Sequence, residues 1–353
     1  MIQAIRRYEI SEAQELAIRR LAVSGFVLVV VIFCAARLLN VYPWNERLFD
    51  LWAYWSTRFG LDYASARPGA SGAYIYSPAF AHLISPLTAL PLPVFMAIWT
   101  AFVAATLYWL AGWRSFFISL FIPVVMSIAI GQTDLLMAAA IVIGFRWPVA
   151  WFLPIVTKLT PGVGLVWFAV RREWRSLTIA LAATVVIAAA SFLIDPQAWL
   201  GWFAMLGRME FPAPGDGVYL PVPVWVRLPL VAALIVWGAR SNRRWVLPVG
   251  VCLSLPTVWL NTPTILVAIL PMLSRGALAP AGRWLRAGGS PIASPLAIPW
   301  SRWRRRARRA GLVLRRELGG LSAFAAAGSA GSVLAARGEF ASQSGDEDGV
   351  IRG

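Results

Sequence analysis

The sequence predicts an all-helical protein that crosses a membrane several times. Of its 353 residues, 59% are hydrophobic and only 14% are charged. Its apolar runs approach the length that crosses a hydrocarbon core of about 30 Å. They cover approximately residues 21–39, 93–112, 115–130, 133–145, 147–170, 176–194, 219–239, 245–260 and 262–274. We therefore expect about eight full transmembrane helices, together with one broken segment.

The basic residues indicate how these helices are oriented. A net charge of +16 would suggest a nucleic-acid partner in a soluble chain. Here, however, the arginines flank the apolar runs, which is typical of a topology signal, so no nucleic acid is expected as a partner. The positive-inside rule places all but seven of the 32 basic residues in the cytoplasm. The prediction is a multi-pass protein of the plasma (inner) membrane, with residues 1–20 and the carboxyl terminus cytoplasmic.

The run 147–170 poses the main topological choice. A single crossing would put Arg146 and Arg171 on opposite sides of the membrane. A hairpin of two half-helices, broken around Lys158-Leu159-Thr160-Pro161, keeps both inside, and Pro161 can end a helix. We expect the hairpin.

This choice leaves two external loops in a transmembrane domain of residues 21–275. The first covers residues 40–92 and the second covers residues 195–218. Trp199, Trp202 and Trp225 lie in or near the second loop and are expected to be interfacial anchors.

Residues 276–353 differ in composition from the rest of the chain and form a predicted cytoplasmic tail. Arg302 to Arg316 is a basic stretch with tryptophans and leucines interleaved. It is either a helix lying on anionic membrane lipid or a solvated tail that only fixes topology. The last thirty or so residues are expected to be disordered.

Asp50 is the strongest candidate for chemistry because it is a carboxylate in an apolar context. It follows the first membrane helix by about ten residues and is flanked by leucine, phenylalanine and tryptophan. Loss of solvation raises the pKa of such a carboxyl, which would make it a usable proton acceptor. The alternative is a helix-capping aspartate, or one paired with Arg47 or Arg58.

Lys158 is the single lysine of the chain and lies in the middle of an apolar run. A cation at that depth costs about 2.5–3.5 kcal/mol, so it requires a partner or a wet cavity. Thr160 and Pro161 have the pattern of an N-cap and first helical residue, and a helix start beside an ammonium group suits a phosphate. The alternative is that Lys158 pairs with Asp134, which follows Gly131-Gln132-Thr133 at another outward helix end.

No cofactor or metal is expected. His82 is the single histidine, and we interpret it as a surface residue of a short helix that ends near Leu90. Cys34 and Cys252 lie in apolar runs and are interpreted as packing residues. The sequence contains no glycine-rich nucleotide loop, which leaves soluble nucleotide-sugar chemistry without support.

Several short motifs occur together in a recognisable order. They are Asp50, then Tyr74-Ile75-Tyr76-Ser77-Pro78, Ser85-Pro86-Leu87, Gly131-Gln132, and Lys158-Leu159-Thr160-Pro161 followed by Arg171-Arg172. In this order and spacing the chain resembles glycosyltransferase family 87, a mannosyltransferase-like family of the GT-C superfamily, over residues 20–275.

The resemblance implies a GT-C-like bundle and transfer of a sugar, typically mannose, from a polyprenyl phosphate. It implies Asp50 as general base, and it matches Lys158 to the lysine-proline region of the family. From the residues themselves we expect Lys158 and Thr160 at the donor phosphate, with Gln132 and Asp134 in support. Trp52, Tyr74 and Tyr76 either contact the sugar or lipid, or are interfacial aromatics that need no ligand. We expect inversion at the sugar and a glycolipid or polysaccharide acceptor. The alternatives are a transporter or lipid flippase, and a non-catalytic scaffold on anionic lipid.

Overall fold

The computed structural model of the protein describes residues 12–41, 49–66, 72–208 and 222–273, and in these ranges the chain is helical with no strand. The predicted sites at Arg47 and Arg302–Arg316 lie outside the described residues. The longer helices are α1 (Glu12–Leu38), α3 (Pro78–Thr88), α4 (Leu92–Ala111), α7 (Asp134–Gly144), α10 (Trp174–Ile194), α11 (Pro196–Arg208) and α12 (Val224–Arg240). The shorter ones are α2 (Phe49–Ser56), η1 (Thr57–Phe59), η2 (Gly112–Arg114), α5 (Ser115–Ile118), α6 (Ile122–Ile130), η3 (Pro148–Trp151), α8 (Phe152–Thr157), η4 (Thr160–Leu165), α9 (Val166–Val170), α13 (Val246–Ser254), η5 (Thr262–Ala268) and α14 (Ile269–Leu273).

Within the described ranges, three helical segments are long and apolar enough to cross a membrane. They are Ala13–Leu38, Leu92–Ile118 and Trp174–Ile194. Helices α6 and α7 pass the same test only as a pair, and they are bent by 104° at their junction. The predicted count of about eight full transmembrane helices is therefore not confirmed. Most of the remaining apolar runs are divided into short helices. Helices α6, η3, η4 and η5 each have a proline at the first or second residue, which has no N–H to continue a preceding turn.

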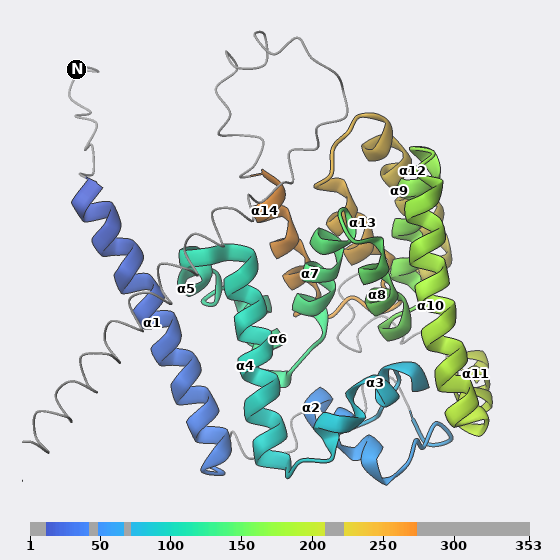
Figure 1. The fold of residues 1–353 in the computed structure, drawn as a ribbon, viewed down its shortest axis with the longest axis horizontal. Helices are drawn as coiled ribbons and strands as arrows, with labels where there is room; N and C mark the ends of the chain where they lie inside the picture. The colour runs from blue at the N-terminus through green and yellow to red at the C-terminus, as the bar shows by residue number, and fades with distance from the viewer. Residues whose placement is uncertain (1–11, 42–48, 67–71, 209–221, 274–353) are drawn as a thin grey trace, which may run out of the picture. The chain divides into compact units, whose positions relative to one another are not determined.

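Two of these long helices expose much of their apolar surface. Only 17% of the apolar window of α1 and 11% of that of α10 are buried within the protein. A helix that is apolar all round and remains uncovered is typical of a segment in lipid. Figure 1 shows α1 beside α4, while α10 runs along α8 and α9 at the opposite side. The chain is thus a membrane protein by helix length and composition.

Helix α7 connects the two hydrophobic cores. Leu135, Leu136 and Ala138 pack into a core shared with α2, α3, α4 and α11. Met137 and Ile141 pack into a second core with α12, α13 and η5. Because α7 is covered on both sides, its first residue, Asp134, is also fully buried. The helix start at Asp134 is therefore held between two packed layers.

The predicted break at Lys158 is present in the structure. Helix α8 ends at Thr157, Lys158 has an extended backbone, and η4 begins at Thr160. The ring centroids of Trp151 and Phe168 are 6.2 Å apart. A continuous helix would separate them by about 25 Å, so the two halves fold back on each other as a hairpin requires.

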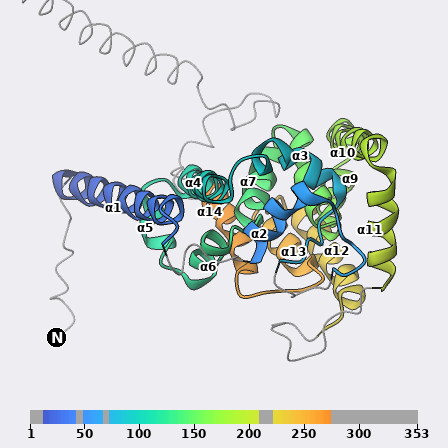
Figure 2. The same ribbon diagram turned by 90° about the horizontal axis from the view of Figure 1, so that it is seen from below.

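The first predicted external loop is largely structured. Residues 49–59 form α2 and η1, and residues 78–88 form α3, which begins at Pro78. Helix α2 lies between α6 and α3 and contacts both of them (Figure 2). The second predicted loop contains α11, while its residues 209–218 lie outside the described part of the chain.

Candidate active site

Asp50 lies in the first turn of α2 and is partly buried. The Tyr76 hydroxyl lies 3.1 Å from its Oδ1 atom, and the Gln132 amide nitrogen donates to its Oδ2 atom at 2.5 Å. Both carboxylate oxygens therefore have a side-chain donor from a distant part of the chain. The alternative pairing with Arg58 is wrong, because that guanidinium lies over the Trp55 ring and donates to the Leu90 carbonyl.

Tyr76 is the centre of the hydrogen-bond network around Asp50. The Tyr54 hydroxyl donates to the Tyr76 hydroxyl at 3.0 Å, and the Gln132 Oε1 atom lies 3.3 Å from that hydroxyl. The Tyr63 hydroxyl donates to the Tyr76 carbonyl at 2.8 Å, which fixes the backbone at this point. A carboxylate held in this way has its orientation set before any substrate arrives.

The expectation that Tyr74 and Tyr76 are interfacial aromatics free to contact a sugar or lipid does not fit this structure. Their exposed fractions are 6% and 3%, and the Tyr74 hydroxyl donates to the Ser77 carbonyl at 2.9 Å. They pack instead into the core beneath α2. Trp52 is partly exposed and packs against the Trp55 ring at a centroid distance of 5.3 Å. Among the three aromatics, Trp52 is thus the most exposed.

Gln132 reaches Asp50 because of the turn between α6 and α7. Gly131 has φ +76°, in the left-handed region that favours glycine, and it ends α6. Its carbonyl accepts a hydrogen bond from the Trp99 indole at 2.8 Å. A Cβ atom at Gly131 would lie 2.4 Å from the Leu51 side chain, so the turn packs directly on the residue that follows Asp50.

Lys158 pairs with Asp134, as the alternative interpretation expected. The ammonium nitrogen lies 2.9 Å from Asp134 Oδ1, and the Asn261 amide donates to Asp134 Oδ2 at 2.7 Å. The Lys158 side chain is 18% exposed, whereas that of Asp134 is fully buried. The ion pair therefore joins the hairpin break to the start of α7, with one of the three ammonium N–H donors used by Asp134.

Asp50 and the ion pair are close enough to influence each other. Burial raises the pKa of the Asp50 carboxyl to about 6, and the Lys158 cation opposes this increase. The hydrogen bonds from Tyr76 and Gln132 also lower the pKa, while the negative charge of Asp134 raises it. Asp50 is thus mostly ionised at neutral pH, yet it is a stronger base than an ordinary aspartate.

The predicted N-cap at Thr160 is wrong by one residue. Leu159 holds the N-cap position, and Thr160 is the first residue of a 3₁₀ helix without a side-chain cap. The Thr160 hydroxyl is buried and has no hydrogen-bond partner in the structure. A buried hydroxyl that remains unpaired is costly, which marks this position for a ligand or a water molecule.

Two further predictions about side-chain exposure need correction. Trp199 and Trp202 are each 7% exposed and donate to Ser191 and to the Ile75 carbonyl, so they hold α11 against the protein rather than anchor it in an interface. Trp225, in contrast, is 69% exposed. His82 is partly buried and lies 2.8 Å from the Ser191 hydroxyl, between α3 and α10.

Tyr54 and Asn261 are site residues that the sequence analysis missed. Tyr54 follows Asp50 by four residues, a spacing that puts both on one face of a helix. Asn261 precedes Thr262-Pro263, just as Lys158-Leu159 precedes Thr160-Pro161. Both Thr-Pro pairs begin 3₁₀ helices, η4 and η5, and each break delivers a polar side chain to Asp134. The repeated Thr-Pro pattern was the available signal for Asn261.

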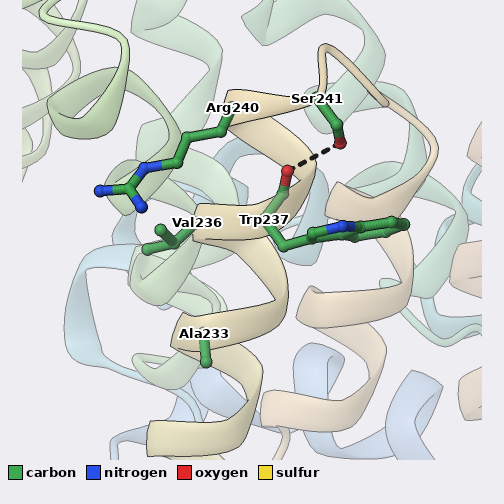
Figure 3. Close-up of a pocket in the computed structure, with 5 residues that line it drawn as sticks. All are labelled: Ala233, Val236, Trp237, Arg240 and Ser241. Carbon is green, nitrogen blue, oxygen red and sulfur yellow. Dashed lines mark hydrogen bonds between the residues drawn. The ribbon is translucent and has the colours of Figure 1, made fainter.

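Two surface cavities formed by described residues lie apart from the Asp50, Tyr76 and Gln132 side chains, which line neither of them. One, of about 530 Å³, is lined by Ala233, Val236, Trp237, Arg240 and Ser241 on α12 and just beyond its end. Figure 3 shows the Ser241 hydroxyl directed at the Trp237 carbonyl, with Arg240 extending away from it. The other, of about 660 Å³, is lined by eight residues between Ser56 and Ala66 and by Gly72, Ala73 and Tyr74, next to Asp50 along α2.

Comparison with known protein families gives a match to part of the chain. Residues 74–216 match the sequence model of glycosyltransferase family 87. The predicted resemblance to glycosyltransferase family 87 is confirmed over this segment, and it indicates a glycosyltransferase. The match includes Tyr76, Gln132, Asp134 and Lys158, while Asp50 and Asn261 lie outside it. No curated protein and no solved structure matches the chain.

Proposed function

We propose that this chain is an integral-membrane glycosyltransferase that moves a mannosyl group from a polyprenyl phosphate to a hydroxyl of a glycolipid or polysaccharide. The family match and the exposed apolar helices support this class of enzyme. One observation carries the proposal. The Asp50 carboxylate is held by Tyr76 and Gln132 and lies within the electrostatic influence of Lys158.

In the proposed reaction, Asp50 removes the proton of the acceptor hydroxyl while that oxygen attacks the anomeric carbon. The bond between the anomeric carbon and the phosphate oxygen breaks, and its electron pair leaves with the polyprenyl phosphate. Attack opposite to the leaving group inverts the configuration of the sugar. A general base positioned in this way contributes about 10²- to 10⁴-fold to the rate.

Lys158 is proposed to stabilise the departing phosphate. Asp134 uses one of its N–H donors, and Asn261 holds the second oxygen of Asp134. The remaining ammonium donors, together with the unpaired Thr160 hydroxyl two residues later, support binding of an anion here. Asp134 would then orient Lys158, and Gln132 and Tyr76 would orient Asp50.

The proposed enzyme lies in the plasma (inner) membrane, with both termini in the cytoplasm and Asp50 on the opposite side. The distribution of arginines along the sequence supports this orientation. On this topology, no nucleotide sugar reaches the site, and the donor is the lipid-linked sugar of that leaflet.

The test uses membrane vesicles that contain the full chain and radiolabelled polyprenyl-phosphate mannose. We expect the wild type to transfer label to endogenous acceptors, and Asp50→Asn to lose at least 100-fold in rate. Glu173→Gln is the control for loss of a carboxylate, because Glu173 is 39% exposed and pairs with Arg171 between α9 and α10. Normal transfer by Asp50→Asn would remove Asp50 from the mechanism.

One observation favours the transporter alternative. Polar groups at the junctions α6–α7, α8–η4 and α13–η5 meet at Asp134, and interrupted helices around a charged site are typical of transporters. The same vesicles separate the two functions. A transporter would move the intact lipid-linked sugar between leaflets without releasing polyprenyl phosphate, whereas the proposed enzyme releases it in step with labelled product.

A further inference from the structure

We infer that the 660 Å³ cavity beside α2 binds the acceptor, and that its ligand is a neutral saccharide. This inference rests on the proposed function, since it assigns the second substrate of the same reaction. The cavity is lined by Ser56, Thr57, Phe59, Gly60, Leu61, Asp62, Ser65, Ala66, Gly72, Ala73 and Tyr74. Its volume is within the range of about 300–1,000 Å³ found for small-molecule sites.

The cavity is adjacent to Asp50 through two segments of the chain. Ser56 ends α2, six residues after Asp50, which corresponds to about 9 Å along a helix. On the other wall, Tyr74 lies two residues before Tyr76, whose hydroxyl contacts Asp50. A short oligosaccharide seated in the cavity therefore has the length to present a terminal hydroxyl toward Asp50.

The polar groups of the cavity offer acceptors rather than donors. The Ser56 hydroxyl donates to the Ala53 carbonyl at 3.1 Å, and the Thr57 hydroxyl donates to the Tyr54 carbonyl at 2.7 Å. The Ser65 hydroxyl donates to Asp62 Oδ2 at 2.5 Å. Each hydroxyl proton is already used within the protein, so only oxygen lone pairs remain for a ligand.

Asp62 adds a negative charge to this set of acceptors. Its carboxylate accepts the backbone N–H groups of Ala64 and Ser65 as well as the Ser65 hydroxyl. The Ser65 hydroxyl bond, followed by these backbone N–H bonds, lowers the pKa of the Asp62 carboxyl, so it stays ionised at neutral pH. Asp62 is a charged side chain among the described lining residues, and the Arg58 guanidinium lies 5.5 Å from the ring centroid of the lining residue Phe59. Next to the Asp62 carboxylate, a ligand must therefore supply hydrogen-bond donors and carry no negative charge.

A sugar meets both conditions and also matches the apolar part of the cavity. Its hydroxyls are donors, and the C–H face of its ring packs on aromatic and aliphatic surface. Phe59 is 72% exposed and provides aromatic surface beside the Arg58 guanidinium, which lies 5.5 Å from its ring centroid, and Leu61 adds aliphatic surface. The α12 cavity in Figure 3 is different, because it is mainly apolar and carries the Arg240 cation. Of the two cavities, the one beside α2 has the chemistry of a neutral polyol site.

The experiment measures binding directly, by saturation-transfer NMR on the full chain in detergent. The probes are methyl α-mannobioside and its 6-phosphate derivative. We expect the neutral probe to bind and the phosphorylated probe to bind at least tenfold more weakly. Asp62→Asn and Phe59→Ala should each weaken binding of the neutral probe about tenfold, because each removes a contact to the ligand. The controls Glu173→Gln and Phe117→Ala change a carboxylate and an exposed aromatic elsewhere.

The same variants are then assayed for sugar transfer. Asp62→Asn should raise the acceptor KM about tenfold, with kcat and the donor KM unchanged. If the probe binds in the expected order but no transfer occurs, the proposed reaction fails while the saccharide site stands. If transfer occurs and Asp62→Asn changes neither probe binding nor acceptor KM, the inference is overturned. Equal binding of the neutral and phosphorylated probes would also overturn it.

Discussion

Gly131→Ala tests whether the turn between α6 and α7 positions the site. The added Cβ would lie 2.4 Å from the Leu51 side chain and 3.2 Å from the Trp99 ring. Leu51 follows Asp50, and Gln132 follows Gly131. We therefore expect relief of this close contact to displace Asp50 or Gln132, whose side chains are hydrogen-bonded to each other. We expect both stability and catalysis to decrease.

The expected loss of stability has two parts. Alanine in the left-handed region costs about 1–2 kcal/mol. Overpacking of a filled core adds about 1–3 kcal/mol, and Leu51 is fully buried. The expected loss in the free energy of unfolding is about 2–5 kcal/mol in total. The size of the overpacking contribution depends on how far the Leu51 side chain can move. Since 1 kcal/mol shifts Tm by about 2–4 °C for a domain of this size, Tm should decrease by about 4–20 °C.

The assay compares Gly131→Ala with Gly112→Ala by thermal unfolding in detergent and by transfer rate below both transitions. Gly112 also has a positive φ, of +61°, but a Cβ there would meet nothing within 4 Å. The control should therefore lose stability through backbone strain alone and keep its kcat. A Gly131→Ala variant with normal kcat, or a control that loses activity equally, would refute the positioning role of this turn.

Two further predictions concern protonation and the ion pair. Because Asp50 accepts a proton only when ionised, kcat/KM should rise with pH and reach half its maximum near pH 6. In Gln132→Leu the pH of half-maximal kcat/KM should move upward by about one to two units, because a hydrogen bond to a charged group contributes about 1.5–3 kcal/mol. An unchanged midpoint would show that Gln132 does not influence the protonation of Asp50. Lys158→Met should destabilise the protein by about 3–5 kcal/mol because it leaves Asp134 buried without its cation. Chemical denaturation should show that the double variant Lys158→Met with Asp134→Asn recovers part of the lost free energy of unfolding. If it recovers none, the loss in Lys158→Met does not come from the broken ion pair with Asp134.

Local signals in the sequence predicted a large part of the site. An apolar context around Asp50 predicted its raised pKa, and the Thr-Pro pair after Lys158 predicted the break between α8 and η4. The pairing of Lys158 with Asp134 was one of two stated interpretations, because a deeply placed cation requires a partner. Each of these depends on a charge or a helix breaker within a few residues.

The parts that could not be predicted depend on contacts between distant segments. Hydropathy measures apolar length but does not report a bend such as the 104° turn between α6 and α7, so the number of full spans was not confirmed. The burial of Tyr76 follows from packing under α2, and the bond from Asn261 to Asp134 joins residues 127 positions apart. No pattern within a short window contains that information.

A double-mutant cycle tests most directly whether Asp50 and Lys158 act on the same reacting pair. The measurement is kcat/KM for mannosyl transfer by wild type, Asp50→Asn, Lys158→Gln and the double variant, where glutamine retains a donor for Asp134. Groups that act together are strongly non-additive, so the double variant should be no more than about threefold slower than the slower single variant. If instead the two losses multiply, Asp50 and Lys158 act independently and the proposed mechanism is contradicted.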